Sequence, residues 1–133
     1  MKSRYITTGA SLALIAVLLG AFGAHILKEK ISLTDLQSFE TGLRYQMYHA
    51  LAIILLGLIT DRFKHLFLTI GFWLFLAGTV LFSGSIYLLS TRELTGFFWT
   101  WLGPITPIGG LMLIVGWVML ILTGTKINEE AEE

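Results

Sequence analysis

The sequence predicts an all-α integral membrane protein. The predicted fold is a four-helix up-and-down bundle, with an amphipathic extension before the second helix and a proline-broken start to the fourth. The composition places the chain among membrane proteins, because 55% of its 133 residues are hydrophobic, only 14% are charged and the mean hydropathy is +0.77. Residues 5–24, 66–91 and 94–125 are free of charged side chains, and residues 45–60 are interrupted only by His49. About 20 apolar helical residues cross the hydrocarbon core of a bilayer.

We therefore expect one transmembrane domain over residues 1–133. Its spans would cover about residues 5–26, 43–60, 66–90 and 104–123, with the amphipathic extension at about 33–43 and an acidic tail at 127–133. The second apolar stretch is short by itself. It can continue backward as helix through Arg44, because the long arginine stem can snorkel to the membrane surface.

The composition also bounds the function. Nine basic and nine acidic residues give a net charge of zero, so no nucleic-acid partner is expected. The absence of cysteine excludes disulfides, thiolate metal sites and cysteine nucleophiles. The sequence shows no Ser-His-Asp order, HExxH motif or paired carboxylates. We therefore expect no enzymatic activity, no cofactor and no metal site.

The first apolar stretch follows Lys2 and Arg4, as in a secretory signal peptide. It is longer than the roughly 7–15 apolar residues of a signal core, so we interpret it as a retained span. Ala16, Gly20 and Ala24 recur every four residues and predict a face for close helix contact.

The second helix is expected to begin at Ser32, which forms a capping box with Asp35 three residues later. At 100° per residue, polar and aromatic side chains gather on one half of the helix, while Gln46 lies on the apolar half as an exception. The members of the polar half are Gln37, Glu40, Thr41, Arg44, Tyr45, Tyr48 and His49. Glu40 and Arg44 stand four residues apart in the acid-first order that favours an ion pair. Arg44 can be tolerated in the span if it pairs with Glu40 and faces the interior of the bundle.

The later turns are marked by charge, aromatic residues and proline. A polar turn is expected at residues 61–65 and another at Arg92 and Glu93. The aromatic residues at 97–99 and 101 suit the membrane interface. Thr106 as N-cap and Pro107 as first helical residue predict the start of the last helix, which would end near Leu122 before a frayed acidic tail.

Four spans place both termini on one side of the membrane. Five basic residues on that side against four on the other favour cytoplasmic termini. The up-and-down order brings the polar residues of the spans toward the opposite face. These residues are His25, Glu40, Arg44, Tyr45, His49, Ser83, Ser85, Tyr87, Thr106 and Pro107. They form either a ligand-binding pocket or a structural polar cluster that fixes the helix register, and both interpretations remain open.

Four segments, "GAFGAH", "TGLRYQMYHALAI", "SGSIYLL" and "WLGPITPIGG", occur in the order typical of one family. Together they resemble the domain-of-unknown-function 423 family. The matching positions are His25, Gly42, Tyr45, His49, Ser83, Gly84, Tyr87, Gly103, Pro104, Pro107 and Gly110. The resemblance implies a four-span protein of the bacterial inner membrane, and it implies no activity.

Several functions are compatible with this sequence. We favour a non-enzymatic membrane component, an accessory subunit or assembly factor in a larger membrane protein complex. The alternative is a small lipid- or ion-binding carrier that acts as a homo-oligomer, because four spans enclose little space alone. A further variant has His25 and His49 as axial ligands of a haem. For all of these functions we expect the protein to be embedded in the lipid bilayer, which is its expected partner.

Overall fold

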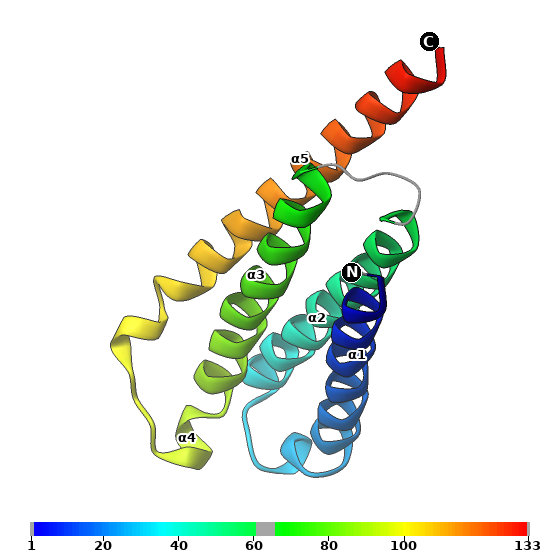
Figure 1. The fold of residues 1–133 in the computed structure, drawn as a ribbon. Helices are drawn as coiled ribbons and strands as arrows, with labels where there is room; N and C mark the ends of the chain where they lie inside the picture. The colour runs from blue at the N-terminus through cyan, green and yellow to red at the C-terminus, as the bar shows by residue number, and fades with distance from the viewer. Residues whose placement is uncertain (1, 61–65, 133) are drawn as a thin grey trace.

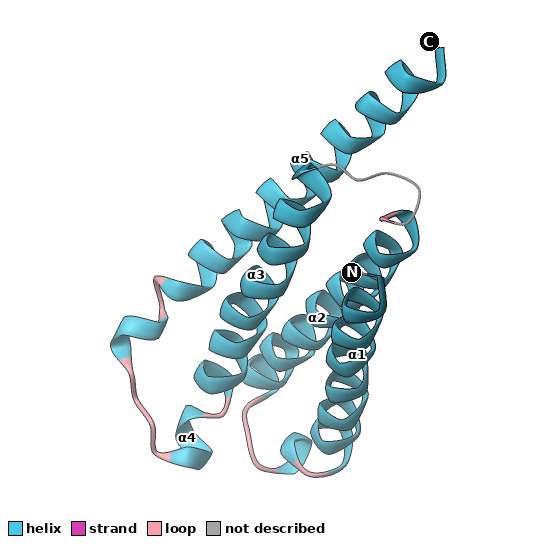
Figure 2. Ribbon diagram, viewed as in Figure 1, coloured by secondary structure: helices cyan, strands magenta, loops and turns pink. Residues whose placement is uncertain are grey.

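The computed structural model describes residues 2–60 and 66–132, so the polar turn expected at residues 61–65 lies outside the described residues. Four long helices dominate the chain: α1 (Lys2–His25), α2 (Leu33–Ile59), α3 (Leu66–Ser90) and α5 (Ile105–Glu132). Short helices follow α1 and α3, namely η1 (Leu27–Glu29), α4 (Arg92–Thr95) and η2 (Thr100–Leu102). The four long helices are long and apolar enough to cross a membrane, which confirms the predicted all-α fold (Figure 2).

The long helices run up and down, each against its neighbour in the chain. The extensive contacts join α1 to α2, α2 to α3, and α3 to α5. Consequently α2 and α3 occupy the middle of the bundle, and α1 and α5 flank them (Figure 1). The start of α1 and the end of α5 lie toward the same end of the bundle, as four spans require.

The apolar core lies mainly in the half of the bundle nearer to the termini. The rings of Tyr5 and Phe72 stack there with centroids 4.1 Å apart, which joins α1 to α3. The buried residues of this core are Tyr5, Ala52, Ile53, Leu56, Leu68, Phe72, Phe75 and Leu113. Most of the buried polar side chains lie in the middle or in the opposite half, namely Gln46, His49, Thr79, Ser83, Ser85 and Ser90.

The contact between α1 and α2 differs from the sequence prediction. Ala16 is buried as expected, but Ala24 is exposed and Gly20 only half-buried. The buried small residues are Gly9, Ala16 and Gly23, which recur every seven residues. When two neighbouring helices cross at a small angle, residues spaced seven apart stay at their interface. Residues spaced four apart move progressively around the helix and leave the interface. A Cβ atom at Gly9 would lie only 2.6 Å from the carbonyl oxygen of Ala50.

The start of α2 confirms Ser32 as the predicted N-cap, with Asp35 as its partner. The Ser32 hydroxyl accepts a hydrogen bond of 3.1 Å from the backbone N–H of Asp35 and donates one of 2.9 Å to the Asp35 carboxylate. The helix then continues without a break to Ile59. The amphipathic extension and the second span are therefore one helix.

The start of α5 corrects a prediction. The helix begins at Ile105, and the carbonyl of Pro104 accepts from the N–H of Ile108 at 3.4 Å. Thr106 therefore lies inside the helix and is not the N-cap. Its hydroxyl bonds to that of Ser85. Pro107 is the third helical residue, where the missing N–H has no intrahelical partner to lose. The helix runs on to Glu132, so its expected end near Leu122 is also wrong.

Candidate functional site

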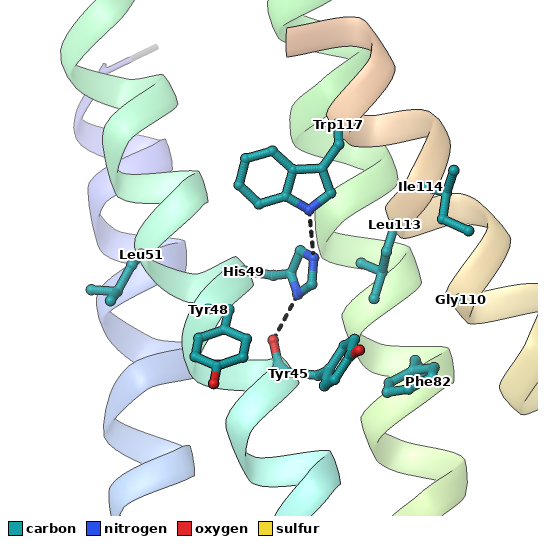
Figure 3. A pocket seen from close by; sticks show the side chains of 9 residues that line it. All are labelled: Tyr45, Tyr48, His49, Leu51, Phe82, Gly110, Leu113, Ile114 and Trp117. Carbon is teal, nitrogen blue, oxygen red and sulfur yellow. Dashed lines mark hydrogen bonds between the residues drawn. The ribbon is translucent and has the colours of Figure 1, made fainter. Parts of the chain in front are cut away.

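A cavity of about 750 Å³ opens between α2 and α5, over the face of α3 (Figure 3). We call it the α2–α5 groove. Its lining residues are Tyr45, Tyr48, His49, Leu51, Phe82, Gly110, Leu113, Ile114 and Trp117. Most of these side chains are apolar or aromatic, and several are exposed on the outer surface of the bundle. In a membrane that surface faces lipid, so the groove opens sideways into the bilayer.

His49 forms the polar floor of the groove and is only 4% exposed. The indole Nε1–H of Trp117 donates to Nε2 of the imidazole at 3.0 Å, and Nδ1 lies 2.7 Å from the carbonyl oxygen of Tyr45. An indole N–H can only donate, so Nε2 must be the unprotonated acceptor and Nδ1 must carry the proton. His49 is therefore neutral in this arrangement, and a single tautomer satisfies both bonds.

Aromatic rings surround His49. The centroid of its ring lies 5.4 Å from that of Phe75 and 5.9 Å from that of Trp117, and Phe75 contacts Trp117 edge-on at 5.0 Å. At the next turn of α2, Tyr45 packs against Phe82 with centroids 4.8 Å apart. These contacts between three helices fix the walls of the groove in one shape.

The hydroxyl groups of Tyr45 and Tyr48 are the free polar atoms of the groove. Both tyrosines are exposed, at 41% and 56%, and within the described part of the chain neither hydroxyl makes a hydrogen bond. Figure 3 shows the two rings on either side of the Tyr45 carbonyl, below His49. A phenolic O–H both donates and accepts, so the groove offers two sites for a polar group of a ligand.

A separate polar network joins α1, α2 and α3 and centres on Gln46. Its Nε2 donates to the carbonyl of Leu12 at 2.8 Å, and its Oε1 accepts from the hydroxyl of Tyr87 at 2.8 Å. One turn away, the Ser83 hydroxyl donates to the carbonyl of Gly42 at 2.8 Å. Because these bonds join three helices, the network fits the interpretation of a structural polar cluster that fixes the helix register.

Gln46 is the residue that the sequence analysis did not include in the site. It is 4% exposed and lies on the buried face of α2 between Gly42 and His49. The available signal was its place as the lone polar side chain on the apolar half of the helix. A polar residue there must find a partner within the bundle, since lipid offers none.

The structure separates the predicted site residues into groups. Tyr45 and His49 line the groove. Ser83 and Tyr87 belong to the Gln46 network, and the hydroxyls of Ser85 and Thr106 bond to each other at 2.6 Å, between α3 and α5. Pro107 and His25 are exposed and belong to none of these three groups.

The structure does not place Glu40 and Arg44 as a pair in the interior of the bundle. Both side chains are exposed, and no ion pair joins them among the described residues. Arg44 instead donates from Nη2 to the hydroxyl of Thr41 at 3.1 Å. The buried face of α2 runs through Phe39, Gly42, Gln46 and His49, which turns Glu40 and Arg44 outward.

The geometry does not favour haem ligation by His25 and His49. Both ring nitrogens of His49 already bond to protein groups, so coordination would break one of these bonds. His25 stands exposed at the end of α1, in a different helix from the groove walls.

Four apolar helices with a buried imidazole and a buried amide inside the spans define a multi-pass integral membrane protein. Residues 19–110 match the model of a family described as a protein of unknown function, DUF423, and the chain belongs to that family. It is 43% identical to the UPF0382 membrane protein YwdK of Bacillus subtilis (strain 168), over 92% of this chain and 96% of that protein. It is 35% identical to the UPF0382 inner membrane protein YgdD of Escherichia coli (strain K12), over 98% of this chain and 96% of that protein. No solved structure matches the chain.

Proposed function

We propose that this small integral membrane protein binds a membrane lipid in the α2–α5 groove, in a non-enzymatic role. The observation that carries the proposal is the combination of a 750 Å³ apolar cavity with the hydroxyls of Tyr45 and Tyr48, which make no hydrogen bond to any described residue. Because the cavity opens sideways, a ligand dissolved in the bilayer can enter it without crossing water.

Burial of an acyl chain in the groove gains little by itself, because the chain leaves surroundings that are equally apolar. Affinity must therefore come from close packing and from hydrogen bonds. The aromatic walls supply the packing surface, and the Tyr45 and Tyr48 hydroxyls supply donors for an acceptor such as an ester carbonyl. The bond between Trp117 and His49 holds the two walls at a fixed separation.

Native mass spectrometry of the protein, extracted gently from its own membrane, tests this proposal. The decisive variant is Gly110→Leu, because Gly110 lines the groove and a larger side chain there fills it. Gly124→Leu is the matched control on the same helix, since a Cβ atom at Gly124 meets nothing within 4 Å. We expect a lipid adduct on the native protein and the control, and its loss in Gly110→Leu. Equal lipid binding by all three proteins would refute the proposal.

A second candidate function is that of an accessory subunit or assembly factor, and one feature of α3 favours it. Gly84 lines a surface hollow of about 530 Å³ with Val80, Leu88, Trp99 and Trp101, and a Cβ atom at Gly84 would meet nothing within 4 Å. Small residues on an outward face let a second membrane helix approach closely. Gly84→Leu should then release a larger protein that co-purifies with the native chain. A native chain that is always isolated without such a protein counts against this role.

The membrane orientation is part of the proposal. The relatives are named membrane or inner membrane proteins, and we propose cytoplasmic termini from the excess of basic residues at the terminal side. A C-terminal fusion to alkaline phosphatase, which is active only outside the cytoplasm, should be inactive. An active fusion would reverse the orientation.

A further inference from the structure

We infer that a second hollow, at the membrane face opposite the termini, binds the headgroup of the same lipid, with Arg92 on its phosphate and Asp35 on a headgroup ammonium. This inference rests on the proposed function and adds the lipid class. The hollow has a volume of about 260 Å³ and is lined by Asp35, Ser38, Ile86, Leu89, Ser90, Arg92 and Thr106. We call it the headgroup hollow.

The headgroup hollow and the α2–α5 groove are bounded by the same elements. α2 and α5 line both cavities, and α3 contributes Ile86 to the hollow and Phe82, one turn further into the membrane, to the groove. From Ser38 to His49 on α2, and from Thr106 to Trp117 on α5, each helix advances eleven residues. That is about 16 Å at 1.5 Å per residue, close to half of the ~30 Å hydrocarbon core. One lipid of a single leaflet is therefore long enough to reach from the hollow into the groove.

Arg92 supplies the anion-binding group. It is half-buried, and within residues 2–60 and 66–132 its guanidinium makes no hydrogen bond or ion pair. Exposed aromatic side chains follow it at Phe97, Phe98, Trp99 and Trp101, which places Arg92 at headgroup depth. A guanidinium presents several N–H donors in a plane and matches the oxygens of a phosphate.

Asp35 decides between headgroups. One oxygen of its carboxylate accepts from the Ser32 hydroxyl, and the other has no partner among the described residues. The hollow therefore presents a cation, Arg92, that can bind a phosphate, and an anion, Asp35, that can bind an ammonium group. A primary ammonium can donate to a carboxylate, whereas a glycerol headgroup brings no positive charge. The chemistry fits an ethanolamine phospholipid better than a glycerol phospholipid.

Native mass spectrometry in detergent, with dioleoyl phosphatidylethanolamine and dioleoyl phosphatidylglycerol as probes, tests the inference. We expect the native protein to prefer the ethanolamine lipid. Arg92→Gln should weaken the binding of both lipids roughly tenfold, the factor expected for one lost charged hydrogen bond. Asp35→Asn should bind lipid but lose the preference. Arg44→Gln and Glu40→Gln are the matched controls, because both residues are exposed and line neither the groove nor the headgroup hollow, and both should behave as the native protein.

The outcomes separate the inference from the proposed function. Lipid binding that is lost in Gly110→Leu but unchanged in Arg92→Gln overturns the headgroup assignment and leaves the groove proposal intact. Binding unchanged in Gly110→Leu overturns the groove proposal itself. Phosphoethanolamine without acyl chains should compete only weakly at equal concentration. Full competition by this soluble probe would assign the hollow to a free phosphate compound and overturn the assignment to a lipid.

Discussion

Trp117 on α5 donates its indole N–H to Nε2 of His49 on α2 over 3.0 Å, near the middle of both helices. This bond crosses the inner end of the α2–α5 groove and assigns the proton of the imidazole to Nδ1. The bond joins the two helices that form the walls of the groove, so the stability of the protein and the shape of the ligand site depend on the same contact.

Replacement of Trp117 by Phe should destabilise the folded protein by about 1 kcal/mol or somewhat more. The phenyl ring preserves most of the aromatic contact but leaves Nε2 of His49 without its donor, and buried hydrogen bonds within membranes contribute about this amount. Unfolding in mixed micelles with increasing dodecyl sulfate measures the loss. Trp101→Phe is the control, because Trp101 lies in the exposed segment before α5 and its indole makes no hydrogen bond within the described residues. Equal losses in both variants would contradict a role for the bond.

The tautomer of His49 should be visible by solid-state NMR of protein labelled with ¹⁵N at histidine. Nδ1 is expected to carry the proton and to show the one-bond N–H coupling, while Nε2 shows none, because Trp117 can only donate. The His49→Gln variant identifies the signal by its disappearance. A proton on Nε2 would show that the indole does not bond there.

Gln46 and Tyr87 should be energetically coupled. Gln46→Leu removes the bonds to Tyr87 and to the carbonyl of Leu12, whereas Tyr87→Phe removes only the first. Gln46→Leu should therefore cost more, and the double variant should cost less than the sum of the two. The coupling energy is expected to be about 0.6–1.7 kcal/mol. Strict additivity in the same micellar unfolding assay would show that the bond does not form.

Gly109 and Gly110 should respond differently to the same substitution. A Cβ atom at Gly109 would lie 2.4 Å from the backbone nitrogen of Phe82, so Gly109→Ala must push α5 away from α3. At Gly110 the nearest atom is a ring carbon of Phe82 at 3.6 Å, an ordinary contact. We expect a loss of several kcal/mol for Gly109→Ala and a change within about 1 kcal/mol for Gly110→Ala. A tolerated Gly109→Ala would show that the helices stand further apart.

Glu40→Gln and Arg44→Gln should each change the stability by less than about 0.5 kcal/mol, as is usual for exposed charges without an ion pair. The two side chains are exposed and no ion pair joins them in the described structure. Ser83→Ala is the informative comparison, since it removes a buried bond to the Gly42 carbonyl. A large loss in Glu40→Gln with none in Ser83→Ala would restore the interior ion pair expected from the sequence.

The sequence by itself determined the features that depend on local chemistry. Helix number and class follow from apolar stretches of membrane-spanning length, and the start of α2 follows from the reciprocal bonds that Ser32 and Asp35 can make. The start of α5 was displaced by two residues, because Ser85 on another helix claims the hydroxyl of Thr106 that would have capped it.

The tertiary structure alone decided which residues face inward. In water the apolar face of a helix marks its buried side, but a membrane helix is apolar toward lipid as well as toward its neighbours. The wheel of α2 therefore grouped Glu40 and Arg44 with His49 and set Gln46 apart, whereas packing against α1 and α3 buries Gln46 with His49 and turns the charges outward. The α2–α5 groove depends on the same choice, because His49 and Trp117 are 68 residues apart and meet only when α3 brings their helices together.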